Sequence, residues 1–273
     1  MQLKTENYYD TPFRLVDLSE KSSQLSEGED TVTFKLKISG REIPFGITYE
    51  KSEAGLGAIM PLAHAVCDKV NEISAGESEH ADQPVSCKKG CAACCRYMVS
   101  LSSAEAFFLH DYVLSLASEK RRRIVGMFMR AAKIISENRM PNVFSSYTAE
   151  YDQLRAMSDW YQGLELKCPF LEENTCSIYA VRPLVCREHL VTSIADACNP
   201  SSSKERRLLG LPFSTAETMM AFCGDIEGNS GEALLLALTM FWCGSNSARL
   251  EKIYPAAMLA EKFAKAISAA AEV

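Results

Sequence analysis

The sequence predicts a mainly α-helical protein with an N-terminal β-hairpin and irregular loops around its cysteines. Apolar residues recur at helical spacing over much of residues 55–161, and Ser/Glu pairs of capping-box spacing precede two apolar runs. Alternating apolar and polar residues over 32–38 and again over 43–47 indicate the hairpin. The chain has 273 residues, 47% of them hydrophobic, so it is long enough to bury a full core.

We expect four segments along the chain. Residues 1–30 are polar and predict a loosely held arm, although some of its apolar side chains could dock: Tyr8, Tyr9, Phe13, Leu15 and Val16. The hairpin occupies 31–50, the helical core with the cysteines 51–205, and further helices packed on the same core 206–273. A lone hairpin is marginal in water, so its apolar face should cover the helices or another chain.

The central segment predicts four helices. The first runs from about Gly55 to Ser74 and is followed by a polar linker over 75–84. A second begins at the Ser102/Glu105 capping box, directly after the first group of cysteines. The third and fourth span about 118–138 and 146–161, and we expect them to form an antiparallel hairpin that returns the chain to its starting point.

Three helices are predicted after the last cysteine loop. A helix over Thr215–Cys223 should begin at Ser214, which with Glu217 has capping-box spacing, and end at Gly224. The segment 233–242 is apolar on all sides, which predicts a buried helix. The last helix, over about 247–271, contains Pro255, which should kink or split it.

The cysteines fall into two main blocks. Cys87, Cys91, Cys94 and Cys95 lie within nine residues, at a spacing that puts them on one face of a helix. A looped start with Gly90 in an unusual backbone conformation, followed by a helix with the last three, would serve equally well. The second block is Cys168, Cys176, Cys186 and Cys198, in an irregular loop rich in proline. Thiolates are preferred ligands of zinc and of iron–sulfur clusters, so we expect both blocks to meet at metal.

The two blocks together resemble a known family. A C-x3-C-x2-C-C block followed by C-P-F-L, C-S-I-Y and R-P-L-V-C-R is similar to the YkgJ family of cysteine-cluster proteins, over roughly residues 84–200. The resemblance implies a cysteine-ligated zinc or iron centre and carries no settled reaction. The first block is also distantly similar to the flagellin lysine N-methylases.

The sequence leaves three cofactors open. An iron–sulfur cluster, of the [4Fe-4S] type, is the first candidate, because adjacent Cys94 and Cys95 would project about 100° apart on a helix and so reach different irons. The same geometry suits two neighbouring zinc ions, although the usual two separated C-x2-C pairs are absent. S-adenosylmethionine is the third, because Cys87, Cys91 and Cys94 have the radical-enzyme spacing; no alternating strands follow them.

Each cofactor predicts a different function. A cluster would serve electron transfer or modification of a protein or peptide substrate, zinc would build a surface for a partner protein, and S-adenosylmethionine would serve methyl transfer. Whether the chain is an enzyme stays open, because no catalytic residue can be selected from its sequence. No glycine-rich phosphate loop is present, so ATP or NAD use is unsupported.

Cations and further ligands accompany the blocks. Arg96, Arg182 and Arg187 are expected beside the metal, where they would neutralise thiolates and donate hydrogen bonds to sulfur. His189 could replace a thiol, although a hydrogen bond to a neighbour is the more common role. The cysteines outside the blocks fall in apolar helical stripes and should be buried small hydrophobes; they are Cys67, Cys223 and Cys243.

Charge and composition limit the partners. The net charge of −6 and the pI near 5.4 argue against broad electrostatic binding of nucleic acid or anionic membrane. The apolar run 233–243 is too short to span a bilayer. The first residues lack the apolar core of a signal peptide, which predicts a cytoplasmic protein whose eleven cysteines are free rather than disulfide-bonded.

Overall fold

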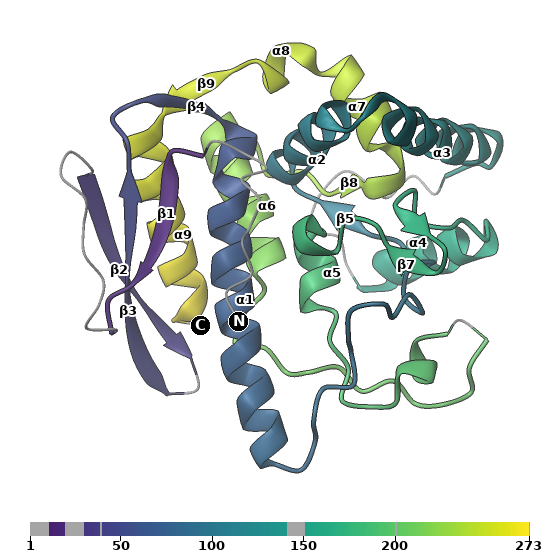
Figure 1. The fold of residues 1–273 in the computed structure, drawn as a ribbon, viewed down its shortest axis with the longest axis horizontal. Coiled ribbons are helices and arrows are strands. Elements are labelled where there is room, and N and C mark those ends of the chain that lie inside the picture. Colours follow the sequence, from purple (N-terminus) through teal and green to yellow (C-terminus); the bar gives the residue numbers. More distant parts are fainter. Residues whose placement is uncertain (1–10, 20–29, 39, 141–150, 200, 273) are drawn as a thin grey trace.

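The computed structural model describes residues 11–19, 30–38, 40–140, 151–199 and 201–272. They form a mainly α-helical fold with a small antiparallel sheet at one side (Figure 1), which confirms the predicted fold class. Throughout these described ranges, no helix combines the length and apolar character needed to cross a membrane.

The sheet contains the predicted hairpin and one strand more. Strands β2 (Asp30–Ile38) and β3 (Arg41–Tyr49) pair antiparallel, as expected. Strand β1 (Phe13–Asp17) pairs with the other edge of β3, so the strand order is β1-β3-β2. A loose arm was therefore the wrong expectation for 13–17, where the side chains of Phe13 and Val16 are buried; residues 1–10 and 20–29 lie outside the described ranges.

Two long helices cover the sheet (Figure 1). Helix α1 (Met60–His80) follows the 3-10 turn Leu56–Ile59 and contacts β1, while α9 (Ala256–Ala271) packs on β2. Residues Ile38 and Phe263 are completely buried in the core that results. Because α1 continues to His80, the predicted linker over 75–84 is wrong for its first half, and the loop to the cysteines starts later.

The capping-box prediction is confirmed in α2 (Ser103–Ser115). The Ser102 hydroxyl accepts a hydrogen bond from the Glu105 N–H at 3.3 Å, and the Glu105 carboxylate accepts one from the Ser102 N–H at 3.0 Å. Both members of the box are buried. The start of this helix is therefore fixed in the core, next to the cysteine loops.

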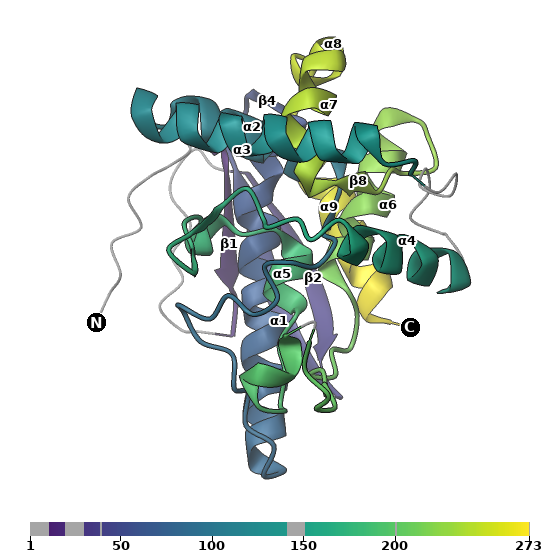
Figure 2. The ribbon, with the colours of Figure 1, turned by 90° about the vertical axis from the view of Figure 1, so that its right-hand side faces the viewer.

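Helix α3 (Ser118–Glu137) matches its predicted range, and α4 (Tyr151–Gly163) follows it. Ile135 of α3 and Tyr161 of α4 belong to one small hydrophobic cluster, which is separate from the main core. The connection over 141–150, including the predicted start of the fourth helix, lies outside the described ranges. Figure 2 shows α3 across one end of the molecule, with α4 and the cysteine loops on the near side of α1.

The helix predicted over Thr215–Cys223 is longer than expected. Helix α6 (Thr215–Glu227) begins at Ser214, whose side chain accepts from the Glu217 N–H, and it runs through Gly224 to end at Gly228. Gly228 has a φ of 73°, which favours glycine. Gly224 is needed for packing, because a Cβ there would lie 2.5 Å from the backbone nitrogen of Gly231.

The single helix predicted over 233–242 is wrong in its first half. Residues Leu234–Leu235 form strand β8, which pairs with β5 (Ser100–Leu101) directly after the first cysteine block. A 3-10 turn over Leu236–Leu238 leads into α7 (Thr239–Ser245). A fully apolar run does not distinguish a buried helix from a buried strand, and here the pairing with β5 decides.

Proline splits the C-terminal segment, as predicted. Helix α8 (Ser247–Leu250) is followed by strand β9 (Ile253–Pro255), and α9 starts at the next residue. Strand β9 pairs with β4 (Glu53–Gly55), which lies just before α1. The C-terminal part of the chain is therefore tied to its N-terminal half.

Candidate metal centre

The first cysteine block forms turns instead of the predicted helix. Gly90 has a φ of 95°, which confirms its unusual backbone conformation. The backbone N–H groups of Cys95 and Tyr97 each donate to the carbonyl three residues earlier, at 3.1 Å. Consecutive turns change direction more sharply than a helix, so neighbouring cysteines can point to different sides.

The second block is irregular, as predicted, but it contains short elements that place its cysteines. Strands β6 (Leu171–Glu172) and β7 (Thr175–Cys176) form a small hairpin that ends at Cys176. Helix α5 (Leu184–Glu188) carries Cys186, and a 3-10 turn over Ala195–Cys198 ends at the last cysteine.

Backbone hydrogen bonds join the two blocks directly. The Cys168 N–H donates to the carbonyl of Cys95 at 2.9 Å, and the Ser86 N–H donates to the carbonyl of Val191 at 2.9 Å. Residues separated by more than 70 positions therefore lie side by side. The expectation that the two blocks meet in space agrees with these contacts.

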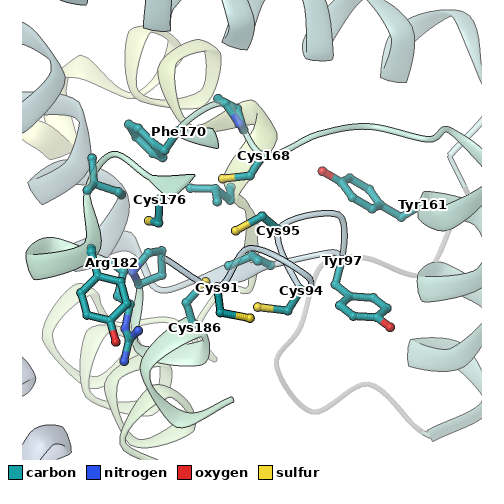
Figure 3. A pocket seen from close by; sticks show the side chains of 16 residues that line it. Cys91, Cys94, Cys95, Tyr97, Tyr161, Cys168, Phe170, Cys176, Arg182 and Cys186 are labelled. Atoms are coloured by element: carbon teal, nitrogen blue, oxygen red, sulfur yellow. The ribbon is translucent and has the colours of Figure 1, made fainter. Parts of the chain in front are cut away.

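A pocket of about 60 Å³ lies where the blocks meet (Figure 3). Its wall contains six of the eight cysteines proposed as ligands: Cys91, Cys94, Cys95, Cys168, Cys176 and Cys186. The aromatic side chains of Tyr97, Tyr161, Phe170 and Tyr179 complete much of the wall. Thiols and aromatic rings thus share one small, mostly apolar space. Phe170 and Tyr179 belong to the C-P-F-L and C-S-I-Y segments, but no role in a pocket was expected for these aromatic residues, because the sequence does not show which of them meet.

The thiols lie near one another, but their sulfur atoms do not converge on a single metal position. Throughout the described ranges, no three His, Cys, Asp or Glu side chains have the arrangement that would hold a metal ion as they stand. Cys87 and Cys198 lie outside the pocket wall, close to His189: the Cys87 sulfur is 3.9 Å from the His189 carbonyl, and the Cys198 sulfur is 4.0 Å from His189 Nε2. Binding one ion would therefore require side-chain rotation.

Backbone N–H groups face several of the sulfur atoms. The Phe170 N–H lowers the pKa of the Cys168 thiol and the Ile178 N–H lowers that of Cys176, each from two residues further along the chain, while the Leu171 N–H donates to the Cys168 carbonyl at 2.9 Å. The Val191 N–H donates to the Cys87 sulfur at 3.3 Å. Such donors stabilise a thiolate, and metal–thiolate centres depend on them. The donor set therefore fits a thiolate-bound zinc ion or iron–sulfur cluster.

The thiols differ in how readily they ionise. Burial raises the pKa of Cys168 to about 12 and also raises that of Cys186. A hydrogen bond from Cys95 lowers the pKa of Cys94 to about 7, and that of Cys95 rises in turn. Most thiols here ionise only when a cation compensates the charge, so metal binding should release protons.

The three arginines expected beside the metal occupy different surroundings. Arg182 lines the pocket with its guanidinium 4.1 Å from the centre of the Tyr179 ring. Its Nε is buried and has no hydrogen-bond partner in the part of the chain that the structure describes, so a donor is left for an acceptor in the pocket. Arg96 directly follows Cys95 and is half-buried.

Arg187 instead holds α5 in place. Its guanidinium donates to both carboxylate oxygens of Asp68, at 2.6 and 2.7 Å, and to the carbonyls of Ala180 and Arg182. The Asn71 amide donates to the Arg187 carbonyl at 3.1 Å. These contacts direct the side chain toward α1, so it connects Cys186 to the helical core.

Two carboxylates, of the buried Glu105 and the half-buried Glu188, complete the attachment of α5. Glu105 accepts from the Leu184 N–H at 2.8 Å, at the start of this short helix. Glu188 accepts from the Ser214 hydroxyl at 2.8 Å and from the Ala216 N–H at 3.0 Å, at the start of α6. Sequence reasoning found the capping role of Glu105 but missed this second contact, because no local pattern reveals a partner 79 residues away.

Glu105 should make the stability of the protein depend on pH. Burial raises the pKa of Glu105 to about 7 from its ordinary 4.5, so between these values the folded protein binds more protons than the unfolded chain. Stability contributed by this group therefore falls as the pH rises through that window, by up to about 3 kcal/mol. We expect Glu105→Gln, followed by denaturant unfolding at several pH values, to lose this slope.

A matched variant is Glu217→Gln, at the equivalent capping position of α6, where the side chain is exposed. It shows how much of any change comes from removing a solvated charge. An unchanged slope in Glu105→Gln would mean that the hydrogen bonds which this carboxylate accepts, from the Ser102 N–H, the Ser102 hydroxyl and the Leu184 N–H, outweigh its burial.

Comparison with known proteins covers the cysteine region alone. Residues 86–206 match the model of the domain family CxxCxxCC, described as a "Putative zinc- or iron-chelating domain". The match includes both cysteine blocks and supports a metal-binding cysteine-cluster domain in this part of the chain. No curated protein and no solved structure matches the chain.

Proposed function

We propose that the pocket holds an iron–sulfur cluster of the [4Fe-4S] type and that the protein acts in electron transfer or in modification of a protein or peptide substrate. The eight cysteines of the two blocks are the proposed metal ligands, in line with the cysteine-ligated centre that the resemblance to the YkgJ family implies. The observation that carries the proposal is the wall of six thiols from distant parts of the chain, faced by backbone N–H donors.

The surroundings favour a cluster over a solvent-exposed ion. A thiolate-bound cluster is anionic, and the buried Nε of Arg182 offers it a charged donor. The aromatic wall, including Tyr161 and Phe170, limits water beside the sulfur atoms. When bound, the cluster would supply one-electron chemistry. The N–H donors and Arg182 would raise its reduction potential, and burial would favour the less charged oxidation state.

Metal analysis of protein purified without oxygen tests this proposal. We expect iron and acid-labile sulfide to be bound together, with an electron paramagnetic resonance signal after reduction. The reducing cytoplasm, where we place the protein, would keep the thiols available. Colourless protein that contains zinc alone would overturn the iron–sulfur assignment.

Zinc is the second candidate, because a pocket of about 60 Å³ whose ligands are all thiolates also suits a structural zinc site, in which protein ligands fill all four positions. In that case the centre would hold the loops together as a surface for a partner protein. A chelator would then unfold the region, and no redox signal would be seen.

S-adenosylmethionine is the third candidate, and it rests on the Cys87, Cys91 and Cys94 spacing shared with the lysine N-methylase resemblance. The geometry gives it less support, because Cys87 lies outside the pocket wall that contains the other two. Calorimetry on the reduced, cluster-loaded protein would show no binding if this candidate is wrong.

A further inference from the structure

Two loops beside the pocket carry more positive than negative charge. Residues 86–96 and 189–209 contain six Lys or Arg and two Asp or Glu, whereas the whole chain has a net charge of −6. Arg182 adds a further cation in the pocket wall. The positive charge is therefore local to the cysteine loops and opposite in sign to the charge of the whole chain.

Backbone hydrogen bonds hold these loops side by side. The Ser86 N–H donates to the Val191 carbonyl at 2.9 Å, and the Thr192 N–H donates to the Arg207 carbonyl at 3.0 Å. Three segments from different parts of the chain therefore form one layer. These segments are 86–89, 190–194 and 206–209.

The layer borders the pocket at two places. The Arg206 guanidinium lies 5.0 Å from the centre of the Tyr97 ring, and Tyr97 lines the pocket. The Lys88 carbonyl accepts a hydrogen bond at 3.0 Å from the N–H of Cys91, which also lines the pocket. The cations of both loops therefore lie next to the pocket.

Four cations of this layer are exposed, and we call them the basic rim: Lys88, Lys89, Arg206 and Arg207. In the part of the chain that the structure describes, none of the four forms an ion pair. Lys204 differs, because its ammonium lies 3.1 Å from the Asp196 carboxylate. Like charges held close together repel one another, so the basic rim attracts carboxylates from outside the chain.

Two exposed apolar side chains accompany the basic rim. Ile194 is 54% exposed and Leu208 is 55% exposed. Apolar side chains together with arginine and tyrosine are typical of the surfaces through which proteins bind each other. Binding of nucleic acid depends chiefly on phosphate contacts and makes less use of exposed aliphatic side chains. The combination therefore favours a protein as the ligand.

We propose that the basic rim, with Ile194 and Leu208, is the docking surface for a protein partner whose own surface is acidic. The negative charge of the rest of the chain repels such a partner, and the basic rim therefore orients it toward the pocket. The partner's role, to exchange electrons with the pocket centre or to be modified there, rests on the proposed function. The docking itself requires only the charges and the two apolar side chains.

Fluorescence anisotropy with a labelled glutamate-rich peptide that contains interspersed leucines tests this surface at low salt. We expect the peptide to bind, and the same peptide with glutamine in place of glutamate to bind at least tenfold more weakly. The double variant Arg206→Glu, Arg207→Glu should weaken binding at least tenfold, and added salt should weaken it further. The double variant Lys88→Glu, Lys89→Glu, in the other loop, should give a similar loss.

The matched control is the double variant Arg122→Glu, Arg130→Glu, on the exposed face of α3. It changes the net charge by the same amount outside the basic rim, so the affinity should stay within about twofold of the wild type. Leu208→Ser changes no charge and should weaken binding about threefold, because apolar contact is lost. Equal losses in the control and in both variants of the basic rim would overturn the docking surface.

Iron and sulfide analysis of the same samples separates this proposal from the proposed function. Peptide binding by protein without iron would retain the docking surface and overturn the cluster. Iron-containing protein that does not bind the peptide would retain the cluster and overturn the docking surface. Tighter binding of a single-stranded DNA oligonucleotide of the same charge than of the peptide would also overturn it.

Discussion

Replacing Cys176 by serine is expected to remove the metal of the pocket with little effect on the fold of the metal-free protein. Cys176 ends the small β6–β7 hairpin and is half-buried, so a hydroxyl at this position can still reach water. Its sulfur is nevertheless faced by the Ile178 N–H and lines the pocket with five other thiols. We expect iron and sulfide content to fall at least tenfold, measured on protein purified without oxygen.

The matched control is Cys223→Ala in α6, because Cys223 is fully buried in the main core. This change should lower the free energy of unfolding by about 1 kcal/mol, since it removes one small buried group and leaves a minor cavity. Metal content should stay at the wild-type level. If Cys223→Ala lost as much metal as Cys176→Ser, general instability and not ligand loss would explain both results.

Features encoded by local physics could be predicted from the sequence. The Ser102/Glu105 box needs only two residues at fixed spacing, and Pro255 kinks or breaks a helix when it lies in the interior. Strand β1 could not be predicted in the same way, because its pairing with β3 depends on a partner more than 27 residues away. The extension of α6 past Gly224 was missed because close packing on Gly231, a tertiary contact, is what selects glycine there.

The candidate metal centre could likewise be predicted where local sequence determines it, but not where tertiary contacts do. Cysteine spacing and composition predicted which residues belong together, since a reduced chain rarely keeps eight clustered thiols without metal. Spacing alone could not show the path of the first block, because turns at Cys95 and Tyr97 replace an expected helix. It also could not direct Arg187 toward Asp68, since a positive charge beside Cys186 is equally compatible with sulfur as a partner.

Replacing Arg187 by methionine is expected to destabilise the protein and to loosen Cys186. The guanidinium is 6% exposed and bonds with Asp68 and two carbonyls, so its loss leaves these acceptors without their buried donor. Asp68 itself is 57% exposed and can be solvated, which keeps the expected loss at about 2–4 kcal/mol of unfolding free energy. Thermal and denaturant unfolding of metal-free protein would measure it.

The metal affinity of Arg187→Met shows whether Arg187 positions Cys186 or only forms an ion pair with Asp68. Because α5 would lose its attachment to α1 while Glu105 and Glu188 still hold its ends, Cys186 should shift and metal affinity should fall about 10–100-fold. The control Lys204→Met breaks an exposed pair with Asp196 near the same loop and should change stability by less than about 1 kcal/mol. If Arg187→Met matched this control in both measurements, α5 would be held by its two carboxylates alone.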